Sequence, residues 1–293
     1  MTTEPAPAKI NLALHVRRRR ADGYHDLETL FAFCADGDIV TVAPAERDSF
    51  AITGPFAADL GRPHPHPSHS PQASGKGEGE WAENLVTRAA DSFRETFATT
   101  TPYAITLDKR LPVASGIGGG SADAAATLRG LARLHGIDRR DDRLFAIAAR
   151  LGADVPACLL GRTAFATGRG DDLTPLDALG DVPVLLVNPG VGVSTAAVFG
   201  QWDGVDRGGI AGEGTPLARA AAGRNDLMPS ASALVPVIGT VLDHLHAAPG
   251  TTLVRMSGSG ATCFALFDGL NARDAAAEGA RSRGRWTLAT TLV

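Results

Sequence analysis

The sequence predicts an α+β protein with two domains. The chain has 293 residues, which is long enough for one large or two medium domains, each with a buried core. Apolar residues alternate along the chain from Ala8 to Val16, a pattern typical of a strand with one buried face. A long alanine-rich stretch instead predicts a helix that runs to about His135, with Gly136 just beyond its end.

The rest of the chain contains further segments with strand-like or helix-like patterns. Asp22-Gly23 predicts a hairpin turn after the first strand. Helices are expected at 83–97, around 144–151 and at 234–246, and strands at 27–33, 39–42, 103–107, 163–166, 182–187, 253–257 and 263–267. The glycine-rich stretch 204–214 is expected to be a surface loop.

The composition is that of an ordinary globular protein and gives no general attraction to polyanions. Apolar residues make up 44% and charged residues 20%, and the net charge is −4. We therefore expect neither a nucleic-acid partner nor a membrane partner. The run Arg17–Arg20 is a local exception, which we interpret as a solvated strand end from which one arginine could reach a phosphate.

The spacing of the cysteines and the composition of the first residues indicate the cellular compartment in which we expect the protein. Cys34, Cys158 and Cys263 are far apart and form neither a metal-binding nor a redox spacing, which favours a reducing environment. The first residues show no apolar signal core. We expect a cytoplasmic protein, and the sequence leaves open whether it is a monomer or a homodimer.

Residues 55–80 differ from the rest of the chain because proline, histidine, serine and glycine dominate them. This composition cannot bury enough apolar surface to order itself, so we interpret the stretch as a disordered insertion. His64, His66 and His69 leave metal binding open as the alternative.

The most informative stretch is a glycine- and serine-rich loop that runs directly into the alanine-rich helix. Glycine lets backbone N–H groups approach an anion, and the start of a helix adds further N–H donors. The stretch therefore predicts a phosphate site, with a flexible surface loop as the alternative. Its residues are Pro112, Val113, Ala114, Ser115, Gly116, Ile117, Gly118, Gly119, Gly120, Ser121 and Ala122.

Two well-known phosphate loops do not fit this stretch. No lysine follows Gly120, as a Walker A loop requires. The dinucleotide fingerprint fits only loosely, because Ser121 stands where its third glycine should be.

The loop resembles that of the GHMP kinases, a family that includes galactokinase and the homoserine, mevalonate and phosphomevalonate kinases. Four further stretches extend the resemblance over nearly the whole chain: Pro7–Leu12, Arg20–Leu27, Leu151–Pro156 and Ser257–Ala261. The resemblance implies an N-terminal domain like domain 2 of ribosomal protein S5 (1–168), an α/β C-terminal domain (169–293), and phosphoryl transfer from ATP with Mg²⁺.

The first two of these stretches are similar to one branch of the family. That branch phosphorylates the 2-hydroxyl of 4-diphosphocytidyl-2-C-methyl-D-erythritol in the non-mevalonate route to isoprenoids. A homoserine or mevalonate type of kinase is the alternative, although those acceptors have no base to stack on the aromatic residues near Asp22-Gly23. A nucleotide-sensing protein without turnover is a second alternative, which the presence of both Lys9 and Asp154 disfavours.

The resemblance implies a catalytic pair. Lys9 would be the cation and Asp154 the base that accepts the proton of the acceptor hydroxyl. Lys9 would keep Asp154 ionised and favour the developing alkoxide. On the residues alone, a solvated strand lysine and a helix-end aspartate are the simpler interpretations.

The resemblance also implies binding residues. Asn84 and Lys109 correspond to positions near the adenine and ribose of ATP, and Ser121 could contact a phosphate or Mg²⁺, although no metal ligand set is assigned. Asp123 could be only a cap residue in the first turn of the helix. Tyr24 and Phe31 could belong to a hairpin core rather than to a base clamp. The acceptor is expected to contact Asn11, Tyr24, His25, Phe31, Thr195 and Phe199.

Overall fold

The computed structural model describes residues 1–60 and 84–293, and these residues form two compact units. Unit 1 comprises Met1–Ala8, Gly37–Val113 and Gly118–Leu160, whereas unit 2 comprises Lys9–Asp36, Ala114–Ile117 and Gly161–Val293. The units interleave along the chain, so no single cut in the sequence separates them. The boundary expected at residue 168 divides the sequence in another way and stays a prediction.

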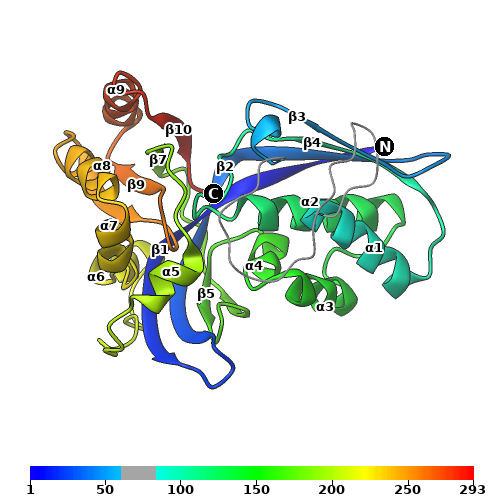
Figure 1. Ribbon diagram of the computed structural model, residues 1–293, viewed down its shortest axis with the longest axis horizontal. Coiled ribbons are helices and arrows are strands. Elements are labelled where there is room, and N and C mark those ends of the chain that lie inside the picture. Colours follow the sequence, from blue (N-terminus) through cyan, green and yellow to red (C-terminus); the bar gives the residue numbers. More distant parts are fainter. Residues whose placement is uncertain (61–83) are drawn as a thin grey trace. The chain divides into compact units, whose positions relative to one another are not determined.

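The two longest strands, β1 (Thr2–Arg19) and β2 (His25–Pro44), contribute to both units (Figure 1). They pair with each other, and the turn between them contains Gly23 with φ +86°, as the Asp22-Gly23 signal predicts. The rest of their sheet has the order β3-β4-β2-β5-β6. The other strands are β3 (Ser49–Thr53), β4 (Tyr103–Asp108), β5 (Ala164–Thr167) and β6 (Asp172–Pro175).

Four helices of unit 1 pack together, and Figure 1 shows them in cyan and green. They are α1 (Leu85–Phe97), α2 (Gly119–Leu134), α3 (Asp142–Leu151) and α4 (Val155–Leu160). Helix α1 contacts α2 and α3, and α2 also contacts α4. Strand β4 turns Tyr103, Ile105 and Leu107 into the core, so its burial alternates as expected for a strand with one buried face.

The expected insertion is only partly within the described residues. Residues 55–60 are ordered: Phe56 donates its backbone N–H to the carbonyl of Lys109 at 3.1 Å, and Ala57–Asp59 form a short 3₁₀ helix. The prediction of disorder is wrong for these six residues, because the backbone finds partners that composition does not reveal. The remainder, including His64, His66 and His69, lies outside the described residues.

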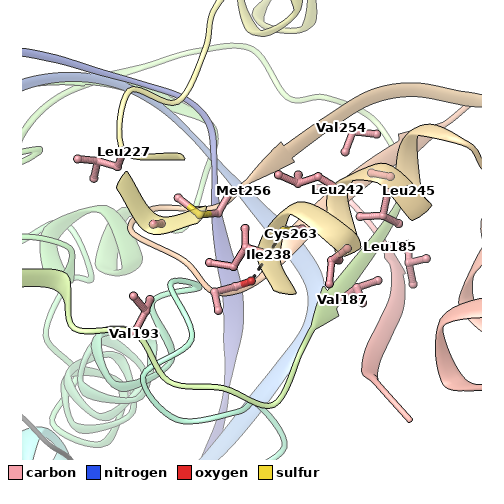
Figure 2. Close-up of a cluster of buried hydrophobic side chains, with 14 of the residues drawn as sticks. Leu185, Val187, Val193, Leu227, Ile238, Leu242, Leu245, Val254, Met256 and Cys263 are labelled. Atoms are coloured by element: carbon pink, nitrogen blue, oxygen red, sulfur yellow. Dashed lines mark hydrogen bonds between the residues drawn. The ribbon is translucent and has the colours of Figure 1, made fainter. Parts of the chain in front are cut away.

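Unit 2 contains a four-stranded antiparallel sheet of order β10-β7-β9-β8, against which α8 (Val237–His246) and α9 (Leu270–Arg281) pack. Its strands are β7 (Pro183–Asn188), β8 (Thr251–Met256), β9 (Cys263–Phe267) and β10 (Trp286–Thr291). Figure 2 shows the core beneath α8, where Ile238, Leu242 and Leu245 face strand residues such as Leu185 and Val187.

Shorter helices complete unit 2: α5 (Thr195–Gly200), α6 (Pro216–Ala222) and α7 (Met228–Leu234). The helix expected at 234–246 is α8, which begins three residues later, at Val237 after Pro236, while Leu234 is the last residue of the separate helix α7. Residues 203–213 form an irregular segment, as the glycine-rich composition predicts. Within the described ranges, the helices are too short or too polar to span a membrane.

Candidate active site

Strand β1 carries its predicted functional side chains in a buried environment. The alternation predicts one buried face, yet every residue from Ala8 to Val16 is buried, and Lys9 and Asn11 are only 2% and 3% exposed. The prediction of a half-buried strand is wrong here. The polar face is covered by other parts of unit 2, which provide hydrogen-bond partners for its side chains.

Lys9 and Asn11 form one hydrogen-bonded group. The Lys9 ammonium donates to Asn11 Oδ1 at 3.0 Å and lies 5.0 Å from the centre of the Phe31 ring. Asn11 Nδ2 donates to Thr29 Oγ1 at 2.8 Å, and Thr29 in turn donates to the carbonyl of Ala13. Each member has a defined donor or acceptor role, so the amide orientation of Asn11 follows from the network.

The first half of the glycine loop, Ala114–Ile117, belongs to the same unit as Lys9. The Lys9 backbone N–H donates to the carbonyl of Ile117 at 3.0 Å. Ser257 joins strand and loop, because its Oγ accepts from the backbone N–H of Asn11 at 3.2 Å and donates to the carbonyl of Gly116 at 2.9 Å. The structure thus brings strand β1, the loop and the Ser257–Gly260 turn together in unit 2.

Gly116 is required by this packing. Its φ is +77°, and a Cβ at this position would lie 2.6 Å from the carbonyl oxygens of Ser257 and Gly260. Ala114 also has a positive φ of +50°, in a region that non-glycine residues rarely adopt.

The second half of the loop opens helix α2 in unit 1. Gly118 is the N-cap residue with φ +68°, and among the described residues no side chain caps this end. The phosphate interpretation requires the N–H groups of this first turn to face an anion, and no capping side chain of the described residues competes for them. Gly120 is exposed and Ser121 is half-buried, whereas Pro112, Ser115 and Ile117 are buried and support the loop from within.

An aromatic cluster in unit 2 contains two of the predicted acceptor residues. The His25 ring stacks on Phe199 with centroids 4.8 Å apart, and the Trp202 ring meets His25 edge-on at 5.6 Å. Burial, followed by the charge of Arg19, lowers the pKa of His25, which favours the neutral ring. The sequence reasoning missed Trp202, which lies two residues beyond the end of α5 and so belongs to no periodic pattern.

The other predicted acceptor residues lie in different surroundings. Phe31 is 1% exposed and faces the Lys9 ammonium, with no ring contact to His25 among the described residues. Tyr24 is 56% exposed, with the guanidinium of Arg169 5.3 Å from its ring centre. Thr195 begins α5, and its hydroxyl lies 2.9 Å from that of Ser259.

Besides residues of the glycine loop, three predicted residues belong to unit 1, namely Asn84, Lys109 and Asp154. Asn84 caps α1 by accepting from the N–H groups of Val86 and Thr87. The Lys109 ammonium is buried between Asp38 and Asp123, at 2.5 and 2.8 Å.

Asp154 stands at the start of α4, where its carbonyl accepts the N–H of Cys158 at 3.1 Å. The residue is half-buried, and it immediately precedes α4 rather than ending α3, which stops at Leu151. Asp154 and Lys9 belong to different units.

Comparison with known proteins gives the family. The model of the GHMP kinases N-terminal domain matches residues 84–162, and that of the GHMP kinases C-terminal domain matches 212–285. A 4-diphosphocytidyl-2-C-methyl-D-erythritol kinase of Rhizorhabdus wittichii is 54% identical, covering 94% of this chain and 88% of the relative. The chain belongs to the 4-diphosphocytidyl-2-C-methyl-D-erythritol kinase family. A second member, from Novosphingobium aromaticivorans, is 47% identical over 99% of this chain and 92% of its own length.

Solved structures agree with this family and its GHMP fold. A crystal structure of 4-(cytidine 5'-diphospho)-2C-methyl-D-erythritol kinase superposes with a TM-score of 0.79 and 36% identity, covering 99% of both chains. Homoserine kinase from Cytophaga hutchinsonii shares the fold, with a TM-score of 0.71 and 19% identity over 99% of this chain and 93% of its own. The predictions of a GHMP kinase fold and of a kinase are confirmed.

Proposed function

We propose that this kinase transfers the γ-phosphoryl group of ATP to the 2-hydroxyl of 4-diphosphocytidyl-2-C-methyl-D-erythritol, a step toward isoprenoid precursors by the non-mevalonate route. The names of relatives at 54% and 47% identity support this acceptor. The observation that carries the proposal within the structure is the His25–Phe199–Trp202 cluster, since stacked aromatic rings suit a nucleobase. Homoserine and mevalonate carry no base for such a cluster.

The acceptor contacts follow from the same cluster. We assign the cytosine to His25 and Phe199, with exposed Tyr24 available to cover the base. Asn11 and Thr195 remain proposed contacts to the methylerythritol part. We assign Phe31 to an indirect role at the acceptor site, because its ring contacts the Lys9 ammonium rather than His25.

We assign the catalytic roles to Lys9 and Asp154. Asp154 would accept the proton of the attacking hydroxyl, and the Lys9 ammonium would stabilise the negative charge that develops on that oxygen. The Asn11 amide and the Phe31 ring hold the ammonium at a defined place on β1, which reduces the reorganisation needed during the reaction.

The nucleotide is assigned to the glycine loop, with its phosphates on the first turn of α2 and its nucleoside near Asn84 and Lys109. Mg²⁺ fits as an ion that arrives with ATP. The described residues hold no group of three or more His, Cys, Asp or Glu that could bind a metal by themselves, and Mg²⁺ commonly uses phosphates and waters as ligands. Ser121 is the proposed protein ligand, and the ion would neutralise charge on the transferring phosphoryl group.

A panel of acceptors tests this function. The purified protein is incubated with ATP, Mg²⁺ and either the proposed acceptor, methylerythritol phosphate without cytidine, homoserine or mevalonate, and the products are identified by phosphorus NMR. We expect one new phosphomonoester, on the cytidine-containing acceptor alone. Equal turnover without the cytidine, or efficient use of homoserine or mevalonate, would contradict the proposal.

A further inference from the structure

Three buried charged residues of unit 1 meet at the base of the glycine loop. Asp38, on β2, has a fully buried side chain, and its Oδ2 pairs with the Lys109 ammonium at 2.5 Å. The same ammonium pairs with Asp123 on α2 at 2.8 Å. We call Asp38, Lys109 and Asp123 the ion clamp.

The ion clamp is bonded to the chain on both sides of the loop. Before the loop, Asp38 Oδ1 accepts the backbone N–H groups of Arg110 at 2.6 Å and Leu111 at 2.8 Å. After the loop, Asp123 lies in the second turn of the helix that the loop enters. One buried cation therefore ties the segment that leads into the loop to the helix that leaves it.

The clamp also lies directly beneath the start of α2. A Cβ on Gly119 would be 3.0 Å from the Lys109 ammonium nitrogen and 3.7 Å from Asp38 Oδ2. The N–H groups of this first turn are those proposed to bind the phosphates of ATP. A shift of the ammonium would therefore be transmitted to the backbone that binds them.

Stability alone is a poor explanation for this arrangement. Two buried carboxylates share one ammonium, and a buried ion pair often contributes no more stability than apolar residues of the same size. Burial raises the pKa of Asp123 to about 7, although Lys109 opposes that effect. Asp123 Oδ1 has no hydrogen-bond partner among the described residues. Burying these charged side chains costs free energy, and their presence is better explained if they fix the geometry of the backbone that they contact.

We propose that Asp38, Lys109 and Asp123 are positioning residues that hold the two ends of the glycine loop at the spacing required by the phosphates of ATP. They act through the backbone, with the Lys109 ammonium engaged by the two carboxylates, so their effect on the phosphates is additional to the proposed place of Lys109 near the nucleoside. This inference rests on the proposed use of ATP at this loop.

Two variants test the clamp. Lys109→Met removes the cation at similar length, and Asp123→Asn keeps the shape and a hydrogen-bonding oxygen while removing one charge. Because small displacements at a binding site are costly, we expect the KM for ATP to rise roughly tenfold in Lys109→Met and severalfold in Asp123→Asn. The KM of the acceptor should stay within about twofold, since the acceptor is assigned to residues of unit 2.

Glu4→Gln is the matched control. Glu4 is a buried carboxylate of unit 1 that pairs with Arg133 at 2.6 Å, near the other end of α2. This variant should lower the melting temperature and leave the KM for ATP unchanged. Direct titration of each variant with ATP gives a Kd that does not depend on turnover.

The outcomes separate the clamp from the proposed function. Turnover by the wild-type protein reports on the function, whereas only the split between the two KM values reports on the clamp. Variants that melt at a lower temperature but keep the wild-type Kd and KM for ATP would overturn the inference. If Lys109→Met does not fold, the ATP affinity of Asp123→Asn decides alone, and an unchanged value would likewise overturn it.

Discussion

At the scale of single residues, burial determines what Lys9 can do. A lysine that is 2% exposed cannot be a solvated strand residue, and its ammonium is directed by Asn11 and by the Phe31 ring. A cation is buried in this way only where neighbouring groups compensate for the lost hydration. The simpler interpretation of Lys9 as a solvated residue therefore fails, whereas for Asp154 the helix-start role and the catalytic role remain to be separated by experiment.

Asp154→Asn separates the two roles. Asparagine also serves well at the start of a helix, so the melting temperature should change little. If Asp154 is the base, turnover should fall roughly 10²–10⁴-fold while ATP still binds. Single-turnover rates and melting curves measured together check this.

Lys9→Met completes this test. It should also impair turnover, and the double variant should lose less than the sum of the two single effects, because the residues act as a unit. A normal rate together with a lowered melting temperature in Asp154→Asn would show that this aspartate serves only the helix.

Two positions of the glycine loop that have a positive φ should respond differently to substitution. Gly116→Ala places a methyl group against two carbonyl oxygens at a positive φ, so it should lower both the melting temperature and the affinity for ATP. Ala114→Gly relieves a residue already at φ +50°, which costs a non-glycine residue about 1–2 kcal/mol. It should leave stability unchanged or slightly raised. Thermal unfolding and ATP titration check both, and a destabilised Ala114→Gly would contradict the argument.

At the scale of elements, local signals determined which predictions succeeded. Helix α1 was predictable from its Asn84 cap, and α2 from the glycine loop and Gly136. The two short helices α4 and α5 were not expected, because six residues are too few to show a helical period. Asp154 and Thr195 begin these helices, so their surroundings could not be inferred from the sequence.

The buried histidine of β1 predicts a pH dependence of stability. His15 Nε2 accepts the backbone N–H of Arg224 at 3.1 Å, which leaves Nδ1 to donate to the carbonyl of Gly208 at 3.0 Å. This arrangement requires the neutral ring. Burial, followed by the charge of Arg224, lowers the pKa of His15 below 6.5, whereas the hydrogen bond to Gly208 and the charges of Asp226 and Glu28 oppose the shift.

The sign follows from linkage. The unfolded chain binds the proton more tightly than the folded one, so this contribution to stability is complete above about pH 6.5 and is lost as the pH falls through the lowered pKa. We expect the free energy of unfolding to decline less steeply on acidification in His15→Gln than in the wild type. His246→Gln, at an exposed position on α8, is the control. The free energy of unfolding is measured by urea titration at several pH values. An equal decline with falling pH in all three proteins would contradict the role of His15.

At the scale of the molecule, the interleaving of the units was beyond sequence reasoning. The motifs of the family located the glycine loop and the catalytic strand, but periodicity says nothing of which distant segments pack together. Leu14 and Val16, near the start of the chain, are buried in the same core as Leu185, Ile238 and Met256. Strand β5 pairs with β2 from Thr29 to Phe31. These contacts join segments more than a hundred residues apart.

This arrangement predicts how the chain responds to division at the expected boundary. A fragment of residues 169–293 lacks Leu14, Val16 and the β5 strand, so it should expose much of the core of unit 2 and fail to unfold cooperatively when heated. Mixing it with a fragment of residues 1–168 should restore both a cooperative melting transition and ATP binding, because each fragment supplies strands that the other needs. Circular dichroism and calorimetry of the separate and mixed fragments test this. A sharp melting transition for residues 169–293 alone would mean that the segment Lys9–Asp36 is dispensable for the core, and that residue 168 is a true boundary between independently folding domains.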